Sequence, residues 1–245
     1  MRRFVLVGAG GTGSMIIDPL LRYLTNIYHE ADSWELGIID GDSVEEKNLS
    51  RQLFDASSVT VNKAVALVNK FPYYQNLIAI PEYLGTDNIR RFLVDGCVVL
   101  IAVDNFLIRA LIEQHCLELE NCVVINGGNE EATGSTQLWI RCGGKDITPP
   151  ISFLHPEILA GGEDRAEMSC QAIAQLDGGT QLITANMASA MFMLVALMQI
   201  APIILNEFNN ADLADPIVWT ELQFNLPKGT TFATDNRSRR GWQED

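Results

Sequence analysis

The sequence predicts a doubly wound α/β fold with a mostly parallel sheet. Short apolar runs rich in β-branched residues alternate with helical patterns between residues 3 and 126, and a glycine-rich turn follows the first run. Strands and helices that alternate in this way form a parallel sheet that helices cover on both faces. A chain of 245 residues has room for one large α/β domain but would be cramped as two, so we expect one domain over residues 1–226.

The expected elements follow one another without long gaps in the first half of the chain. A strand at Arg3–Val7 runs into the glycine turn, and a helix at Thr12–Tyr28 follows the turn. In chain order the remaining elements are a strand at Trp34–Ile39, a polar linker, a helix at Val61–Lys70, a strand at Leu77–Ile80, a short helix at Asp87–Phe92, a strand at Cys97–Val103, a helix at Leu107–Leu119 and a strand at Cys122–Asn126. Ligands of such sheets bind beyond the carboxyl ends of the strands. Gly8, Asp40, Asp104 and Asn126 occupy those ends, so we expect them to converge on one crevice.

The second half of the chain is less regular. After Asn126 we expect a strand at Gln137–Cys142, an irregular crossover over residues 143–180, a late apolar helix and a final strand at Ile217–Asn225. An irregular run of this length inside a domain is typical of a functional lid or crossover. The polar tail over residues 227–245 contains the only basic cluster and is expected to be poorly ordered.

Composition excludes some classes of function. Lys and Arg number 17 against 31 Asp and Glu, and this net charge of −14 disfavours binding to nucleic acid. Five cysteines without a C-x-x-C pair, together with the lack of a signal-peptide pattern, favour a reduced, cytoplasmic protein. The uncharged stretch Met187–Leu205 contains Ser189, Gln199 and Pro202, which favours a buried core or interface helix over a membrane span.

The glycine turn and the next strand predict a nucleotide site. Gly8, Gly10 and Gly13 form a G-x-G-x-x-G pattern between a strand and a helix, where backbone N–H groups and the helix N-terminus can approach phosphate oxygens. Asp40 ends the next strand, where a carboxylate can accept hydrogen bonds from ribose hydroxyls; the alternative is a turn or N-cap aspartate. Asp42 fits either a role at the ribose or a cap of the following turn.

The linker after Asp40 contains residues that a plain dinucleotide site does not need. Asn48, Arg51 and Gln52 are followed by Lys63, which adds two cations close to the ribose carboxylate. Taken singly, each cation is more readily explained as a surface residue. Taken together they favour a site that polarises phosphates for chemistry, and they would have no role beside a hydride in an NAD-linked dehydrogenase.

These motifs resemble those of the ThiF/MoeB/E1 ubiquitin-activating superfamily. Its G-x-G-G-x-G motif is matched at Gly8–Gly13, its D-x-D and N-L-x-R-Q motifs between Asp40 and Gln52, its lysine at Lys63 and its D-N-x-x-x-R motif at Asp104–Arg109. The match spans residues 4 to 130, and N-L-x-R-Q is specific to this group rather than to Rossmann folds in general. The chain is most similar to compact ThiF-like proteins of bacterial and plasmid origin.

The resemblance implies an adenylyltransferase that binds Mg-ATP. Such enzymes activate a C-terminal carboxylate, usually of a ubiquitin-like protein or a peptide, as an acyl adenylate and release pyrophosphate. Carried over to this chain, the phosphates would be held by Gly8, Gly10, Gly11 and Gly13, the ribose by Asp40, the phosphate charge by Arg51 and Lys63, and Mg²⁺ by Asp104, while Asn48 and Gln52 would orient the substrate. Two anions that react with each other need such cations to offset their repulsion.

The chain departs from the family pattern in three respects, of which the first two concern zinc and an arginine. Family members with a structural zinc carry two C-x-x-C pairs, which this chain lacks, so we expect no zinc. Many members also donate an arginine across a homodimer from a helix before the first strand, for which Arg2 or Arg3 would be a weak substitute. A homodimer is nevertheless expected, with the late apolar helix in its interface.

A third difference concerns the nucleophile. Some family members capture the activated carboxylate as a thioester on a cysteine of the crossover, and Cys170 lies in the corresponding place. The alternative is a buried or incidental cysteine, because adenylation alone suffices for several members. His155, beside Pro156, is more readily explained as a turn residue than as a base.

Other functions stay open on the sequence alone. The same fold can activate a small carboxylate for amide or ring formation. A nucleotide-binding scaffold of the E1 type that docks a partner without full catalysis is the non-enzymatic alternative.

Overall fold

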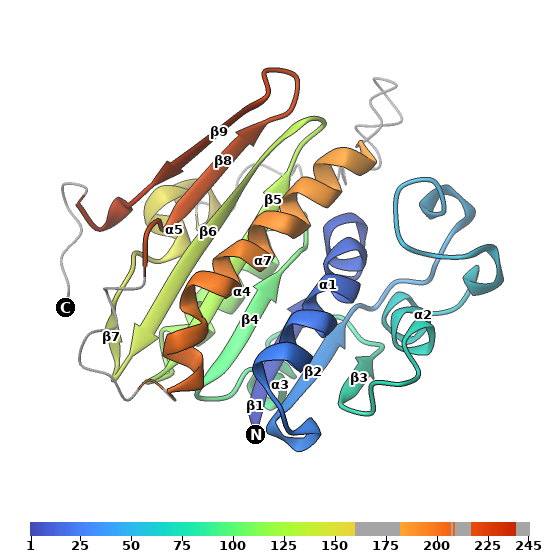
Figure 1. Cartoon of the computed structure of the whole chain (residues 1–245), viewed down its shortest axis with the longest axis horizontal. Coiled ribbons are helices and arrows are strands. Elements are labelled where there is room, and N and C mark those ends of the chain that lie inside the picture. Colours follow the sequence, from blue (N-terminus) through green and yellow to red (C-terminus); the bar gives the residue numbers. More distant parts are fainter. Residues whose placement is uncertain (160–181, 207, 209–216, 239–245) are drawn as a thin grey trace.

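In the computed structural model, which describes residues 1–159, 182–206, 208 and 217–238, one nine-stranded sheet runs through the molecule (Figure 1). The strands lie in the order β3-β2-β1-β4-β5-β6-β8-β9, and β7 pairs with β6. Their bounds are Arg2–Val7 (β1), Trp34–Ile39 (β2), Leu77–Ile80 (β3), Cys97–Ile101 (β4), Cys122–Asn129 (β5), Thr133–Cys142 (β6), Lys145–Asp146 (β7), Glu221–Asn225 (β8) and Thr230–Thr234 (β9).

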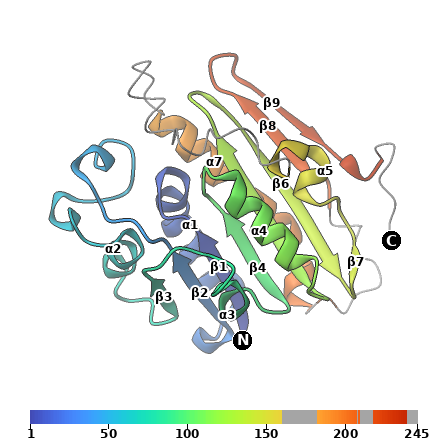
Figure 2. The same ribbon diagram turned by 180° about the vertical axis from the view of Figure 1, so that it is seen from behind.

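Helices cover both faces of this sheet, which confirms the predicted doubly wound α/β class. The helices are α1 (Gly11–Ile27), α2 (Lys63–Lys70), α3 (Ile89–Phe92), α4 (Phe106–Cys116), α5 (Ile151–Leu154) and α7 (Ile183–Leu205). Residues of α1, α2 and α7 share one hydrophobic core, and residues of α3, α4 and α5 belong to a second core. Figure 2 shows α4 and α5 on the face opposite α1 and α7.

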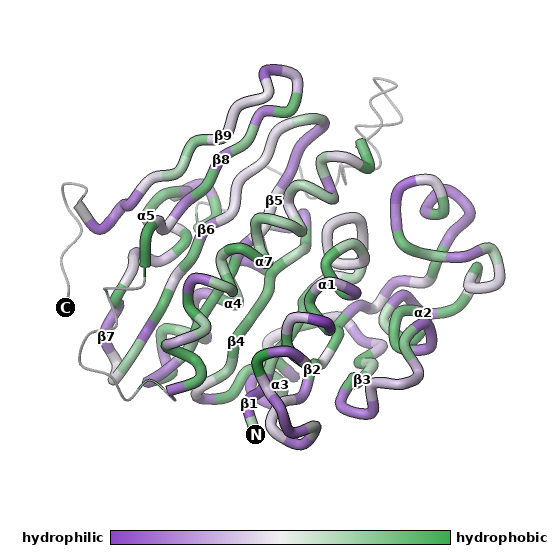
Figure 3. The backbone as a smooth tube through the Cα atoms, viewed as in Figure 1, coloured by the Kyte–Doolittle hydropathy of each residue, from purple (hydrophilic) through white to green (hydrophobic). Residues whose placement is uncertain are grey.

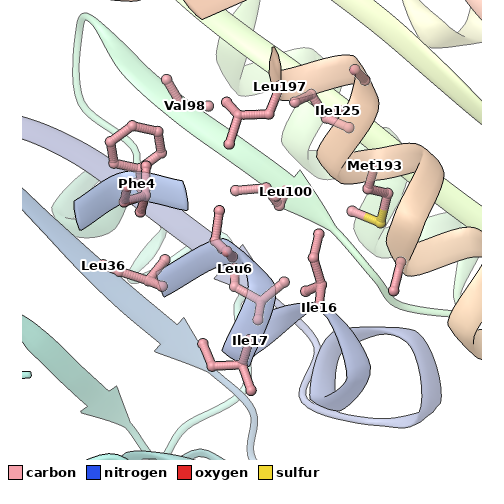
Figure 4. Packing of buried hydrophobic residues seen from close by; sticks show 14 of the residues in the cluster. Phe4, Leu6, Ile16, Ile17, Leu36, Val98, Leu100, Ile125, Met193 and Leu197 are labelled. Atoms are coloured by element: carbon pink, nitrogen blue, oxygen red, sulfur yellow. The ribbon is translucent and has the colours of Figure 1, made fainter. Parts of the chain in front are cut away.

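The larger core lies between the parallel strands and the pair α1 and α7. Phe4 and Leu100 of the sheet face Ile16 of α1 and Met193 of α7, and all four side chains are buried (Figure 4). Most of α7 has the green colour of hydrophobic residues in Figure 3. By length and composition α7 could cross a membrane, but half of its most apolar window is buried in the protein, as expected for a core helix.

The parallel half of the sheet sets the geometry of the site. β3, β2, β1, β4 and β5 run parallel in that order. The register places Val7, Ile39 and Ile101 side by side at the carboxyl ends of three strands, with Asn126 of the longer β5 next to Ile101. Residues 8, 40 and 102 therefore emerge together at one edge of the sheet.

The other half of the sheet is antiparallel and extends farther than the sequence indicates. β5 continues to Asn129 and pairs with β6, β6 pairs with β8, and β8 pairs with β9. Residues 230–234 of the expected poorly ordered tail form β9, because Gly229 adopts a positive φ of 59° in the turn and a β-branched run follows it. Within the expected crossover, residues 145–146 form β7 and residues 151–154 form α5.

Candidate functional site

The glycine turn brings the start of α1 directly against the end of β1. Gly8 has a φ of +95°, and a Cβ on Gly13 would lie 1.9 Å from the Gly8 carbonyl oxygen, so neither position tolerates a side chain. A Cβ on Gly10 would meet nothing nearer than Gln52 Nε2, at 3.9 Å. The first N–H groups of α1 have no acceptor within the helix and carry its positive dipole end. The turn is thus a narrow cradle that suits phosphate oxygens.

Asp40 ties this cradle to the end of β2. Its Oδ2 accepts a hydrogen bond from the backbone N–H of Ala9 at 2.7 Å, and its Oδ1 accepts one from the N–H of Asp42 at 2.8 Å. Burial raises the pKa of the Asp40 carboxyl, and the hydrogen bond from Ala9 opposes that shift. Each oxygen keeps a second lone pair. Asp40 can therefore hold the turn and still accept hydrogen bonds from the hydroxyls of a ribose.

Asp42 and Lys63 form an ion pair beside Asp40. Lys63 Nζ lies 2.8 Å from Asp42 Oδ2, and Lys63 is 4% exposed. Burial acts to raise the pKa of Asp42, but the hydrogen bonds from Lys63 and Tyr83 outweigh it and hold the pKa below its usual value. The amide of Asn62 donates to the carbonyl oxygens of Asp40 and Asp42, at 2.8 and 3.0 Å. Asn62 is not among the predicted site residues, although its position as the N-cap of α2 is a recognisable signal.

The linker between β2 and α2 contains two buried polar atoms that have no partner in the described part of the chain. The Oδ1 of fully buried Asn48 accepts from the N–H of Glu45 at 2.9 Å, which leaves its Nδ2 without a partner there. Gln52 is 7% exposed, and its Oε1 likewise has no hydrogen-bond partner in the described part of the chain. Buried groups of this kind usually have partners, so an unpaired donor and acceptor in the linker beside the cradle fit a site that a polar ligand completes.

Arg51 is half-buried in the same linker. Among the described residues no hydrogen bond or ion pair involves its guanidinium. Its backbone is held, because Asn186 Nδ2 of α7 donates to the Arg51 carbonyl oxygen at 3.2 Å. The backbone is fixed while the cationic end is available to a ligand.

Asn186 links the linker to the cradle and to the end of β5. Its Oδ1 accepts from Asn129 at 3.1 Å, and Asn129 accepts from the hydroxyl of Thr12 at 2.9 Å. Gly11 makes room for it, since a Cβ there would lie 2.5 Å from the Asn186 amide. α7 begins at Ile183, four positions before the expected Met187, so Asn186 lies in the first turn of the helix and not before it. The sequence signal for Asn186 is its position as a polar residue directly before the apolar stretch that begins at Met187.

Asp104 lies on the loop between β4 and α4. The two other members of its motif fix that loop: Asn105 Oδ1 caps α4 by accepting from the N–H of Leu107 at 2.8 Å, and Arg109 Nη2 donates to the Val103 carbonyl oxygen at 2.7 Å. Asp104 itself is exposed, and its neighbour Val103 lies close to the glycine turn, since a Cβ on Gly8 would lie 2.9 Å from Val103 Cγ1. The loop therefore presents a carboxylate at the same edge of the sheet as the cradle.

Asn126 does not join this crevice, contrary to the prediction. It is 1% exposed, and its Nδ2 donates to Gln137 Oε1 of β6 at 2.6 Å. Gln137 in turn lies opposite Glu221 of β8, and His155 lies 2.9 Å from Glu221. β5 continues beyond Asn126 because it forms a long hairpin with β6, so this side chain lies within the sheet rather than beyond its end. His155 is half-buried and pairs with buried Glu221, so it is not a base of the crevice.

The His155–Glu221 pair predicts a pH-dependent contribution to stability. The hydrogen bond to Glu221 raises the pKa of His155 above 6.5. Burial opposes ionisation of Glu221, but its hydrogen bonds lower its pKa from 4.5 to about 2. The contribution of charged His155 to the free energy of unfolding is complete below pH 6.5 and is lost as the pH rises through the raised pKa of His155. The contribution of charged Glu221 is complete above pH 4.5 and is lost as the pH falls toward 2.

Glu221→Gln should therefore lower the free energy of unfolding most between pH 4.5 and pH 6.5, and less below and above this range. Urea denaturation across pH 3 to 9 measures the difference. Asp18→Asn, which removes an exposed pair with Arg22, is the control and should give a small, flat difference. A Glu221→Gln difference that does not vary with pH would contradict the pairing.

The arginines at the N-terminus are engaged within the chain. Arg2 donates to the carbonyl oxygens of Gly96 and Ile204, at 2.7 and 3.0 Å, and Arg3 pairs with Glu35. In this conformation neither arginine side chain is free to reach the site of a neighbouring subunit.

Four of the five cysteines lie in the described residues. Cys97, Cys116 and Cys122 are buried, and burial raises the pKa of the Cys97 thiol far above its usual value. Cys142 is half-buried, and burial raises its pKa as well. The raised pKa makes the thiols of Cys97 and Cys142 poor nucleophiles near neutral pH. Cys170, the candidate nucleophile, lies outside the described residues.

Comparisons with known proteins agree with the motifs. The sequence profile of the ThiF family matches residues 1–230. The adenylyltransferase and sulfurtransferase UBA4 of Eremothecium gossypii is 33% identical over 130 residues, which cover 51% of this chain and 28% of UBA4. The SAMP-activating enzyme E1 of Haloferax volcanii is 29% identical over 129 residues, covering 51% of this chain and 44% of that enzyme.

Solved structures show the same fold. The crystal structure of E. coli MccB with ATP superimposes with a TM-score of 0.61 at 16% identity, covering 96% of this chain and 63% of MccB. MccB with AMPCPP and SeMet MccA gives a TM-score of 0.60 at the same identity. The chain thus spans less than half the length of these two curated relatives, and under two thirds of MccB.

Proposed function

Because the chain belongs to the ThiF family, we propose that it is an ATP-dependent adenylyltransferase that activates a C-terminal carboxylate as an acyl adenylate. One observation carries the proposal: the half-buried Arg51, whose guanidinium has no partner among the described residues, is held by its backbone next to a glycine cradle. A cation with a fixed backbone beside a phosphate cradle can stabilise the negative charge that develops on the phosphate in the transition state. The relative UBA4 is an adenylyltransferase and sulfurtransferase, which supports the same reaction.

Different residues of the crevice bind different parts of the nucleotide in this proposal. We assign the phosphates to the turn formed by Gly8, Gly10, Gly11 and Gly13. The ribose belongs to Asp40, which lies one hydrogen bond from that turn. Arg51 and Lys63 stabilise phosphate charge, and Asp42 holds Lys63 in place until the substrate competes for it. The free Asn48 Nδ2 and Gln52 Oε1 orient the substrate.

In the proposed reaction a carboxylate oxygen of the acceptor attacks the α-phosphorus of ATP. The bond from that phosphorus to the bridging oxygen breaks, pyrophosphate leaves with the electron pair, and the acceptor becomes an acyl adenylate. No proton transfer is needed, because the nucleophile is already an anion. The chain offsets the repulsion between the two anions with Arg51, Lys63 and the dipole of α1. The exposed Asp104 would hold Mg²⁺, which would neutralise phosphate charge when bound.

The proposed acceptor is the C-terminus of a ubiquitin-like protein or a peptide. The SAMP-activating enzyme and the complex of MccB with MccA support an acceptor of this kind. Capture of the activated carboxylate by Cys170 as a thioester, with release of AMP, is the further step that we propose for this chain.

Intact-mass spectrometry tests both steps. A mixture of the protein, Mg-ATP and an acceptor with a free C-terminal carboxylate should yield an acceptor heavier by one AMP residue. The same acceptor with an amidated C-terminus is the matched control and should yield none. An enzyme–acceptor adduct that reductant removes, and that Cys170→Ser abolishes, supports the thioester; an adduct that persists in Cys170→Ser excludes that cysteine.

We further propose a cytoplasmic homodimer in which α1 and α7 form the interface. A shallow apolar hollow of about 280 Å³ lies between these two helices. Its lining residues are Met15, Pro19, Met187, Ala190, Met191 and Leu194. Met187 and Met191 are each more than half exposed, and burial against a second copy would remove this apolar surface from water.

A further inference from the structure

Tyr83 lies on the loop after β3 and is fixed at both ends of its side chain. Its hydroxyl donates to Asp42 Oδ1 at 2.5 Å. Its ring covers Gly41, since a Cβ on that glycine would lie 2.5–2.6 Å from three adjacent ring atoms, Cγ, Cδ2 and Cε2. Three nearly equal distances mean that the face of the ring, and not its edge, lies over the glycine. Tyr83 thus occupies the space that a side chain at position 41 would fill.

The ring is nevertheless exposed. Tyr83 is 68% accessible, which is high for an aromatic side chain held by a short hydrogen bond and by backbone contact. The hydrogen bond to Asp42 and burial raise the pKa of the Tyr83 hydroxyl to about 12. The phenol therefore stays neutral and remains a donor at ordinary pH. A planar apolar surface is kept in a fixed position with little of it buried.

The position of this surface relates it to the nucleotide. Gly41 directly follows Asp40, which we assign to the ribose, and the phosphates lie toward Ala9 and the glycine turn on one side of Asp40. The base of a nucleotide leaves the ribose from the carbon opposite the phosphate-bearing end. It must therefore extend away from the turn, toward Gly41, Asp42 and the β3 loop, where Tyr83 lies.

We propose that the exposed face of Tyr83 is a stacking platform for the purine base of the bound nucleotide. This inference rests on the proposed function, because it assumes that Asp40 holds the ribose. Base–aromatic stacking contributes about 1–3 kcal/mol per base, which corresponds to a change of about 5- to 150-fold in Kd. Gly41 is required for this arrangement, since any side chain there would displace the ring.

Equilibrium binding in the absence of an acceptor tests the proposal. The Kd for ATP and for ribose 5-triphosphate, which lacks the base, is measured by calorimetry for the wild type, Tyr83→Phe and Tyr83→Leu. Leu fills most of the space over Gly41 without a π face, whereas Phe keeps the ring and loses the hydroxyl. We expect Tyr83→Leu to weaken ATP binding by about tenfold, Tyr83→Phe to stay within about twofold of the wild type, and the Kd for ribose 5-triphosphate to be equal in all three proteins.

Two results would overturn the proposal while leaving the proposed function intact. One is wild-type ATP affinity in Tyr83→Leu. The other is an equal loss in Tyr83→Phe and Tyr83→Leu, which would assign the effect to the hydroxyl and Asp42 instead of the ring. A wild-type protein that binds neither ATP nor ribose 5-triphosphate would contradict the proposed function itself, and the stacking platform with it. Unchanged binding of ribose 5-triphosphate by the variants also shows that they are folded.

Discussion

Replacing Arg51 by alanine is expected to lower the rate of ATP–pyrophosphate exchange by about 10²–10³-fold, the range found when one pre-oriented donor to a transition-state anion is removed. The side chain is half-buried, and Asn186 fixes its backbone at a distance of 3.2 Å, so little motion is needed when phosphate charge develops. Lys63 cannot replace it fully, since Asp42 already neutralises that ammonium. Exchange is measured with radiolabelled pyrophosphate and the acceptor that gives the highest rate with the wild type.

Lys47→Ala is the matched control for Arg51→Ala. Lys47 lies in the same linker, is exposed and pairs with Glu45 at 2.9 Å, so its loss should leave the exchange rate within about twofold of the wild type. Equal rates in the two variants would show that Arg51 is a surface cation. Thermal unfolding of both proteins separates a lost phosphate contact from a lost fold.

Gly13→Ala should both destabilise the protein and abolish nucleotide binding. The new methyl carbon would lie 1.9 Å from the Gly8 carbonyl oxygen, a distance that no side-chain rotation can relieve because both atoms are fixed by the backbone. α1 must then move away from β1, which disrupts the packing of Ile16 and Ile17 in the larger core. We expect a loss of about 3 kcal/mol in the free energy of unfolding, at the upper end of typical overpacking costs, as measured by urea denaturation.

Gly10→Ala provides the comparison within the same turn. A Cβ at position 10 would meet no atom nearer than 3.9 Å, so the fold should tolerate it with a change of less than about 1 kcal/mol. If Gly13→Ala proves as stable as Gly10→Ala, the close approach of α1 to the turn does not limit the fold, and the geometry assigned to the cradle is wrong.

The parallel half of the fold and most of the crevice were predictable because their signals are local. Short apolar runs define β1, β2 and β4, and Gly8 and Asp40 directly follow two of these strands. Parallel strands bring residues that follow them to the same edge of a sheet, and this placement does not depend on how the rest of the chain packs.

The contacts that were missed depend on residues far apart in the sequence. Asn186 reaches the Arg51 carbonyl across 135 positions, and no local pattern specifies which turn of an apolar helix faces the cradle. Asn126 was misplaced for a related reason: the pairing of β5 with β6 sets how far β5 runs, and that pairing carries the side chain into the sheet. The Lys63–Asp42 pair likewise depends on how α2 packs against the end of β2.

The products of ATP cleavage test the central claim most directly. With the wild type, Mg-ATP and an acceptor that has a free C-terminal carboxylate, attack at the α-phosphorus predicts AMP and pyrophosphate and no ADP. Replacement of that carboxylate by an amide should stop cleavage. ADP and phosphate as products, or ATP that is bound but never cleaved with any ubiquitin-like or peptide acceptor, would contradict adenylation and leave a nucleotide-binding scaffold.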